Sequence, residues 1–277
     1  MSIVETINSL FSEMTKSEKK IASHFMENTN TFAFETLDGI AEKIGTSTTS
    51  VIRFCRRLGF SGYKPLQSEV RARVKSTLPL PAKLERVAVN NGEDIGHRKI
   101  LQNVIDCIDK TFEDVSEEMI CSAANIISEA KRVFCFGLKE SFALAHYAYT
   151  RFLTIRSNVF MLSAVQGGEI ESILSLGNDD ACIFFLFHRY TNPAPKILEL
   201  LKKQGVKVIL VTSPPFETIE ENADILFSCN VDINGIKNSA AAPICIVDCL
   251  CNSLASYDEK TLEYLNKSEE LFKEFIF

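Results

Sequence analysis

The sequence lacks the features that would place it in a membrane, in a secretory pathway or around a metal ion. No apolar run in its 277 residues approaches the ~20 needed to cross a bilayer. Residues 1–11 lack the basic segment and cleavage pattern of a signal peptide. The nine cysteines lie mostly in apolar stretches, without a CxxC pair or a nearby histidine. We therefore expect a cytoplasmic protein with reduced thiols, no metal, no cofactor and no membrane partner.

Acidic residues are scarce in one part of the chain only. The formal net charge is -6, but residues 1–76 hold 11 Lys+Arg against 8 Asp+Glu, and residues 77–277 hold 19 against 28. Within residues 43–75, eight basic side chains accompany a single acid, Glu69. A basic cluster of this kind is typical of contacts to phosphates, whereas the acidic remainder would not itself bind DNA.

Residues 37–58 show the pattern of a helix-turn-helix. Two apolar stripes at helical spacing flank Gly45: Leu37, Ile40, Ala41 and Ile44 in the first, and Val51, Phe54, Cys55 and Leu58 in the second. Ser47 is placed to cap the second helix, and Gly59 to end it. The outer face of the second helix is basic and rich in hydroxyls, which suits it to a major groove. The alternative interpretation is a generic helical hairpin with solvated arginines.

If the second helix reads DNA, its side chains divide into two groups. Thr48, Thr49 and Arg53 lie nearest the base edges, where they would select sequence. The side chains expected to contact phosphates, which position the protein without selecting sequence, are Ser47, Ser50, Arg56, Arg57 and Lys64. Two such helices in a dimer predict a pseudo-palindromic double-stranded operator with half-sites spaced by helical turns.

The hydrophobic period predicts two domains. Residues 1–76 read as an all-α bundle, in which Thr15 and Glu18 form a capping box and residues 29–35 form a connection with buried Phe32 and Phe34. Residues 77–98, with two prolines and an Asn-Asn-Gly breaker, read as a linker. Residues 99–277 then alternate short apolar strands with helices. The expected strands are residues 132–136, 158–162, 180–187, 206–212 and 224–229, and the helices are 99–114, 116–131, 140–153, 167–176, 193–204, 239–256 and 259–277. This alternation predicts an α/β fold with a parallel sheet covered by helices on both faces.

Residues 15–67 resemble the helix-turn-helix domain of RpiR-family bacterial transcription regulators, most specifically at residues 48–63, TTSVIRFCRRLGFSGY. The α/β part resembles the sugar isomerase (SIS) domain that follows it in that family. The resemblance implies a homodimer or homotetramer held by SIS domains, which bind a phosphosugar or related anionic metabolite and alter DNA binding. It also implies a cytoplasmic protein that associates with the nucleoid when bound to DNA.

The resemblance implies an effector site at the carboxyl ends of the strands, where parallel sheets hold their ligands. SIS domains carry a Gly-x-Gly-x-Ser-like turn after the first strand, and this sequence has Gly137, Lys139 and Ser141 there. After the third strand the usual Ser-x-Ser-Gly-x-Thr loop is replaced by a stretch that contains His188, Arg189 and Thr191. Arg189 could replace the lost donors by a bidentate contact to an anion, or it could block the pocket or form a structural ion pair. Ser213 after the fourth strand and Ser239 before a late helix complete the set of expected ligand contacts.

Two alternative functions remain open from the sequence. The first is a sugar-phosphate isomerase, for which His188 and Glu169 would be candidate bases by position, although the basic helix-turn-helix would then be unexplained. The second is a regulator that has lost its ligand, because the usual serines and glycine of the third-strand loop are absent. We expect a regulator without enzymatic activity.

Overall fold

The fold is described from a computed structural model. It describes residues 3–77, 80–81, 83–84, 87, 96–162, 170–188, 193–214, 219–255 and 259–276. The chain divides into two compact units, residues 1–79 and 80–277, and each is described by itself. None of the helices within these described ranges is both long enough and apolar enough to cross a membrane.

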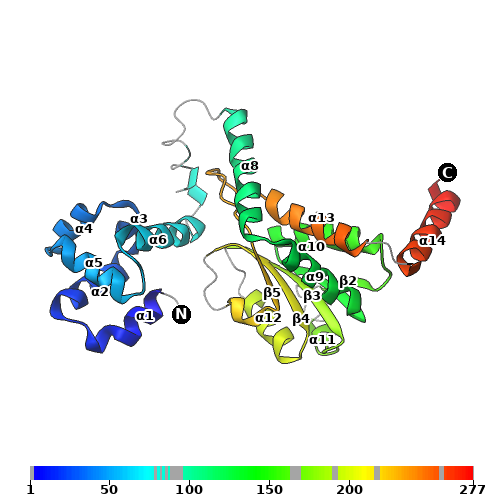
Figure 1. Ribbon diagram of the computed structural model, residues 1–277, viewed down its shortest axis with the longest axis horizontal. Helices are drawn as coiled ribbons and strands as arrows, with labels where there is room; N and C mark the ends of the chain where they lie inside the picture. The colour runs from blue at the N-terminus through cyan, green and yellow to red at the C-terminus, as the bar shows by residue number, and fades with distance from the viewer. Residues whose placement is uncertain are drawn as a thin grey trace. The chain divides into compact units, whose positions relative to one another are not determined.

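The first unit is built from helices, as expected for residues 1–76 (Figure 1). Its elements are α1 (Ile3–Leu10), the 3-10 turn η1 (Phe11–Glu13), α2 (Lys16–Glu27), α3 (Thr29–Phe34), α4 (Leu37–Ile44), α5 (Thr48–Arg57) and α6 (Tyr63–Thr77). The predicted capping box at the start of α2 is confirmed. The Thr15 N–H donates to Glu18 Oε2 at 2.8 Å, and the Glu18 N–H donates to Thr15 Oγ1 at 3.3 Å.

The expectation for residues 29–35 is wrong in two respects. This stretch forms helix α3 rather than a connection, and Phe34 is 55% exposed, whereas Phe32 is buried as expected. The reason is tertiary, because α3 packs on α6. The hydroxyl of Tyr63 donates to the carbonyls of Phe32 at 3.3 Å and Glu35 at 2.9 Å. Burial raises the pKa of Tyr63 to about 12, so this hydroxyl keeps its proton.

The second unit contains a five-stranded sheet of order β2-β1-β3-β4-β5, in which every pairing is parallel. The strands are β1 (Arg132–Gly137), β2 (Val159–Met161), β3 (Asp180–Leu186), β4 (Lys207–Thr212) and β5 (Ile225–Ser228). The helical elements are α8 (His97–Asp114), α9 (Glu117–Glu129), α10 (Glu140–Leu153), α11 (Ile170–Ile173), α12 (Pro193–Lys203), η2 (Ile219–Asn222), α13 (Ala241–Leu254) and α14 (Glu259–Ile276). The predicted α/β class is confirmed, although α13 begins two residues later than expected.

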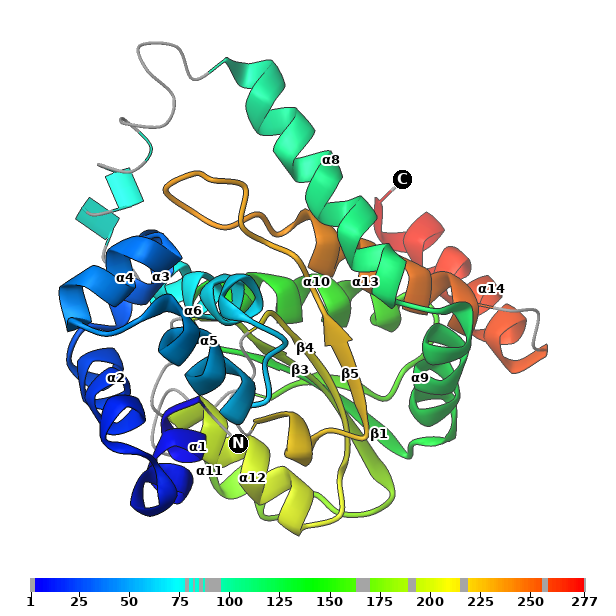
Figure 2. The ribbon, with the colours of Figure 1, turned by 60° about the vertical axis from the view of Figure 1, so that its left-hand side comes forward.

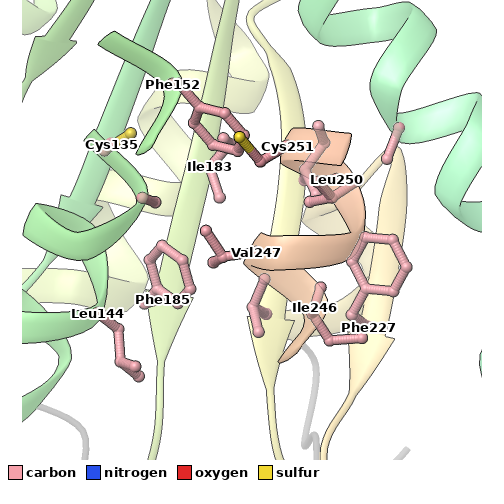
Figure 3. Close-up of a cluster of buried hydrophobic side chains, with 14 of the residues drawn as sticks. Cys135, Leu144, Phe152, Ile183, Phe185, Phe227, Ile246, Val247, Leu250 and Cys251 are labelled. Atoms are coloured by element: carbon pink, nitrogen blue, oxygen red, sulfur yellow. The ribbon is translucent and has the colours of Figure 1, made fainter. Parts of the chain in front are cut away.

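Both faces of the sheet are covered, as Figure 2 shows. Successive residues of β3 point to opposite sides: Ile183 and Phe185 join the core under α9, α10 and α13, while Cys182 and Phe184 join the core under α11 and α12. Figure 3 shows the first of these cores around Phe185. Because the three central strands β1, β3 and β4 are buried on both sides, their sequences are almost continuously apolar rather than alternating.

Candidate functional site

The geometry of the helix-turn-helix is set by the turn between α4 and α5. Gly45 adopts a left-handed conformation with φ 67°, and the Thr46 N–H donates to the Ala41 carbonyl at 2.9 Å, which ends α4. The hydroxyls of Thr46 and Ser17 lie 2.9 Å apart, so the turn is also attached to α2. These contacts fix the point at which α5 begins, and with it the face that α5 presents.

The predicted cap of α5 is confirmed, because Ser47 Oγ accepts the Ser50 N–H at 3.2 Å. The apolar stripe of α5 is buried, with Val51, Phe54 and Cys55 each 0% exposed. The opposite face is open. Ser47, Thr49, Arg53, Arg56 and Lys64 are exposed, and Thr48 and Ser50 are partly exposed. The structure therefore brings these predicted DNA contacts to one surface of the first unit.

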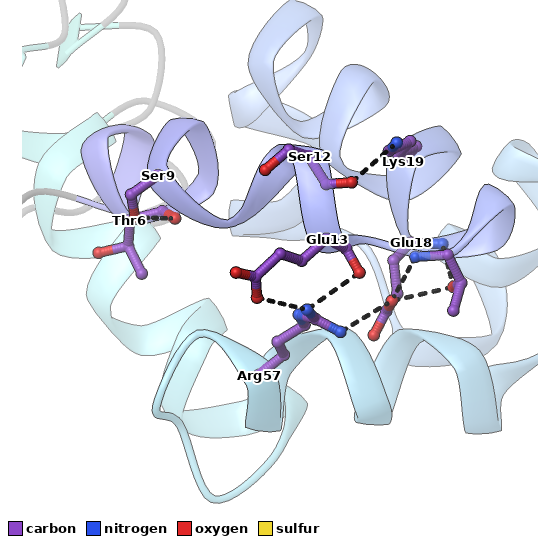
Figure 4. Close-up of polar contacts among 8 residues, drawn as sticks. Thr6, Ser9, Ser12, Glu13, Glu18, Lys19 and Arg57 are labelled. Atoms are coloured by element: carbon purple, nitrogen blue, oxygen red, sulfur yellow. Dashed lines mark hydrogen bonds and ion pairs between the residues drawn. The ribbon is translucent and has the colours of Figure 1, made fainter.

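Arg57 differs from its neighbours on α5. Its guanidinium turns toward α2 and η1, as Figure 4 shows. Nη1 lies 3.5 Å from Glu18 Oε2, and Nη2 lies 3.5 Å from Glu13 Oε2 and donates to the Glu13 carbonyl at 3.1 Å. Burial opposes ionisation of Glu18, but hydrogen bonds from Thr15 and the charges of Arg57 and Arg53 outweigh it and lower the pKa of Glu18. A phosphate contact by Arg57 would have to compete with these two carboxylates.

A groove of about 530 Å³ runs beside the exposed face of α5. Its walls come from the start of α4, the later half of α5 and the start of α6, and its lining includes Ile52, Arg56 and Lys64. Two of the expected phosphate contacts thus lie on one concavity. The sequence placed both residues on a basic surface, but it could not show that they share a groove.

In the second unit, the carboxyl ends of the strands form the candidate effector site. The loop after β1 leads to α10 on one face of the sheet, and the loop after β3 leads to α12 on the other face. Neighbouring strands whose loops diverge in this way open a crevice at the sheet edge, where ligands of such folds bind. Gly137 ends β1 and pairs in register with Phe185 of β3, so the two loops begin side by side.

The turn after β1 is packed too closely for any residue but glycine at position 137. A Cβ there would lie 2.2 Å from the Ser141 carbonyl oxygen. Ser141 itself is 8% exposed, and its N–H donates to the Leu138 carbonyl at 3.1 Å. The structure therefore brings Gly137 and Ser141 together at the start of α10.

Lys139, in the same turn, has an unusual backbone conformation. Its φ of 54° and ψ of -119° lie in a region that favours glycine, and the side chain is exposed. Backbone strain of this kind costs about 1–3 kcal/mol and clusters at functional sites. The sequence indicates this strain, because the family pattern has glycine at this position and this sequence has lysine.

The remaining expected contacts are spread along the same edge. His188 lies two residues beyond β3 and is partly exposed, and Ser213 directly follows β4 and is 4% exposed. Arg189 and Thr191 lie outside the described residues, and so does Glu169. Ser239 lies in the loop that leads from β5 to α13, where its hydroxyl accepts the Ala241 N–H at 3.2 Å.

Sequence analysis missed a contact between two of these loops. Lys237, two residues before Ser239, forms an ion pair with Glu140, the first residue of α10. Their positions are 97 residues apart, so no local pattern could have shown it. Within the described ranges, no group of three or more His, Cys, Asp or Glu side chains is placed to hold a metal ion.

Comparisons with known proteins agree with this architecture. The helix-turn-helix domain of the rpiR family matches residues 1–77, and the SIS domain matches residues 126–242. An uncharacterized HTH-type transcriptional regulator of Thermotoga maritima is 23% identical over 276 residues, which is 97% of each chain. The HTH-type transcriptional regulator HexR of Pseudomonas aeruginosa is 24% identical over 212 residues, 76% of this chain and 73% of HexR.

Among solved structures, the NanR protein of Vibrio vulnificus in complex with ManNAc-6P is similar over 99% of each chain, with a TM-score of 0.58 and 16% identity. At that identity the likeness shows the fold. The two domain matches lie in the same order as in the regulators, and together they cover more than half of the sequence. The chain therefore belongs to the RpiR family of transcriptional regulators, with a helix-turn-helix domain followed by an SIS domain.

Proposed function

We propose that this regulator senses a phosphosugar or a related anionic metabolite at the carboxyl ends of β1, β3 and β4. The observation that carries the proposal is the tight turn from Gly137 to Ser141, which places the start of α10 beside the end of β3. The first turn of a helix attracts anions, because its N–H groups point outward and its dipole is positive there. The ligand that NanR holds, ManNAc-6P, is a phosphosugar and supports this choice of chemical class.

The residues proposed to contact the effector are those named from the sequence. They are Gly137, Lys139, Ser141, His188, Arg189, Thr191, Ser213 and Ser239. The structure supports a shared position for the six of them that it describes, because each lies at the end of a strand or at the start of the following helix. The proposed roles of Arg189 and Thr191 rest on the sequence.

For DNA, we propose that Thr48, Thr49 and Arg53 contact bases, while Ser47, Ser50, Arg56 and Lys64 contact phosphates. Arg57, which the sequence placed with the phosphate contacts, is left out of this proposal because its guanidinium is paired with Glu13 and Glu18. A homodimer or homotetramer would present these surfaces in pairs to a double-stranded operator. We place the domain boundaries at residues 1–76, 77–98 and 99–277, and the protein in the cytoplasm, on the nucleoid when bound to DNA. Its relatives carry the names of transcriptional regulators, which supports a protein without enzymatic turnover.

The proposal is tested by binding of the purified protein to its own upstream promoter DNA, measured at several salt concentrations with and without phosphosugars. We expect a footprint, a steep salt dependence and one class of phosphosugar that shifts the affinity by roughly 5- to 150-fold. A footprint that no phosphosugar alters would favour a regulator without a ligand. Sustained conversion of a hexose or pentose phosphate would contradict the proposal that the protein is a regulator without enzymatic activity.

A further inference from the structure

The loop between β5 and α13, residues 229–240, reaches α10, the helix that follows β1, and β1 does not neighbour β5. In the sheet, β5 is separated from β1 by β4 and β3. Three strand spacings amount to about 14 Å. The ion pair between Lys237 of this loop and Glu140 of α10 shows that the loop spans that distance. The orange loop in Figure 2, between β5 and α13, is the segment concerned. It therefore borders the candidate effector site from the β5 side.

The same loop is held along its length by α8. Asn103 Nδ2 donates to the Ile233 carbonyl at 2.9 Å, and the Asn230 N–H donates to Thr111 Oγ1 at 2.9 Å. The Cys107 thiol donates to the Asp232 carbonyl at 3.6 Å. Thr111 is 0% exposed, so this attachment is buried. A displacement of the loop would therefore disturb its hydrogen bonds to α8.

A third attachment comes from the segment that precedes α8. Lys83 Nζ donates to Asn238 Oδ1 at 3.4 Å, and Lys83 is 8% exposed. A lysine this buried keeps its hydrocarbon stem packed and its amine in a defined place. In the sequence, Lys83 follows the last residue of α6, Thr77, by six positions. The loop that borders the effector site is thus bonded to the chain segment that leads into the DNA-binding domain.

We propose that Lys237 binds the anion of the effector and that, when the effector is absent, Lys237 is paired with Glu140 instead. Loop 229–240 then transmits this exchange of partners by Lys237 to Lys83 and α8. The inference rests on the proposed function, because it assigns the regulation of that same site. It adds Lys237 and Glu140 to the effector site, and Lys83 to the route toward the DNA-binding domain.

The exchange is favoured by charge and by exposure. The side chains of Lys237 and Glu140 are 57% and 76% exposed, and an ion pair this exposed is held weakly. A phosphate monoester carries about -1.5 to -2 charges at neutral pH, whereas the Glu140 carboxylate carries one, so Lys237 gains by the exchange. The effector would arrive at the first turn of α10, which itself attracts anions. We expect the loop to shift with Lys237, because this side chain follows the phosphate rather than Glu140.

The first experiment uses the full chain without effector and measures backbone hydrogen exchange by mass spectrometry. Lys237→Met and Glu140→Gln each remove the ion pair. We expect both to raise exchange in residues 97–111 and 229–240 by about threefold, the effect of losing an exposed ion pair. The matched control is Lys267→Met, which removes the exposed Glu263–Lys267 pair on α14 and should leave these segments unchanged. Unchanged exchange in both ion-pair variants would overturn the proposal.

The second experiment measures binding of ManNAc-6P, glucose 6-phosphate and inorganic phosphate by calorimetry. For a probe that binds the wild type, Lys237→Met should weaken binding by about tenfold, the usual effect of losing a charge-assisted contact. Glu140→Gln should bind at least as tightly as the wild type, because the competing carboxylate is gone. Equal binding by the wild type and Lys237→Met would overturn this inference alone. If the wild type bound no probe, the proposed function would be overturned, and with it the roles proposed for Lys237 and Glu140.

Discussion

Arg57 on α5 and Glu18 on α2 form an ion pair, with Nη1 3.5 Å from Oε2, whereas Arg53 and Arg56 on the same helix are exposed. Glu18 also belongs to the capping box of α2, so Arg57 joins α5 to the start of α2. Arg57 is thus an integral part of the bundle. Its neighbour Arg56 is exposed and lines the groove beside α5.

These neighbours should therefore behave differently when each is replaced by alanine. We expect Arg56→Ala to reduce the slope of log affinity against log salt by about one, because one phosphate contact is lost. Arg57→Ala should leave that slope unchanged and lower the free energy of unfolding of the N-terminal unit by roughly 1 kcal/mol. Fluorescence anisotropy across a salt series and thermal unfolding measure the two effects. A reduced slope for Arg57→Ala would show that Arg57 leaves its carboxylates to contact DNA.

Arg53 should contribute to sequence choice rather than to general affinity. We expect Arg53→Ala to weaken operator binding by about 10- to 100-fold and to relax the preference at one base position, as for the loss of a bidentate base contact. Lys64→Ala is the matched control, because a lost phosphate contact weakens all sequences alike. Binding to a library of randomised operators distinguishes them. Unchanged operator binding by Arg53→Ala would contradict the placement of α5 in the groove.

The turn after β1 offers a test through stability. Lys139→Gly should raise the free energy of unfolding by about 1 kcal/mol, because glycine adopts φ 54° without strain. Lys139→Ala keeps a Cβ and should change stability by less than about 0.5 kcal/mol, which makes it the control. Chemical denaturation followed by circular dichroism measures both. Equal stability of the two variants would indicate that the backbone at Lys139 carries no strain.

Gly137→Ala should have the opposite effect at the same turn. The added Cβ would lie 2.2 Å from the Ser141 carbonyl oxygen, so the turn must rearrange. We expect a loss of about 2 kcal/mol or more, comparable to other overpacked sites, together with loss of phosphosugar binding. Gly177→Ala, where a Cβ meets nothing within 4 Å, is the control and should change little. Wild-type phosphosugar binding by Gly137→Ala would contradict the role of this turn.

The ion pair between Arg132 and Asp180 predicts a pH dependence. Asp180 is 3% exposed and accepts from Arg132 Nε at 2.8 Å and Nη2 at 2.7 Å. Burial opposes its ionisation, but the bonds from Arg132 and the Gly177 N–H outweigh it and lower the pKa of Asp180. Because the folded pKa is lowered, the stabilisation is present above about pH 4 and is lost as pH falls through the folded pKa.

We expect Asp180→Asn to cost about 3 kcal/mol at pH 7, as for other broken buried pairs, and the difference from the wild type to shrink below about pH 4. Calorimetric unfolding at several pH values measures this difference. Glu263→Gln, on an exposed pair of α14, is the control and should change little at any pH. A difference between Asp180→Asn and the wild type that stays constant down to pH 2 would contradict the assignment.

Much of the fold was predictable because it is encoded locally. The period of the apolar residues, the cap at Ser47 and the glycine at position 45 all act within a few residues of the helices that they define. Helix α3 was missed because its sequence, TNTFAF, has weak helix propensity, and its conformation depends on bonds from α6. Basic composition also overstated the DNA-binding surface, since Arg71 donates to the Ala33 carbonyl inside the bundle.

The candidate effector site was less predictable for a related reason. The position of the turn between β1 and α10 was predictable from Gly137 and Ser141, because a strand followed by a helix can be read from sequence. The partner of that turn could not be read, because Lys237 reaches Glu140 only through the order of strands in the sheet. That order is a property of the assembled sheet, to which every strand contributes.

The separation of the two cores has a consequence for how the protein is made. Among the described residues, the members of the buried cluster of the first unit lie between Ile3 and Val74. The sheet instead needs Arg132 to pair with Asp180, 48 residues later. Because a chain is synthesised from its N-terminus and local contacts form fastest, we expect the helical unit to fold on the ribosome before β3 has been translated. Each new molecule would then pass through a stage in which the helix-turn-helix domain is folded while the SIS domain, which would control it, is not.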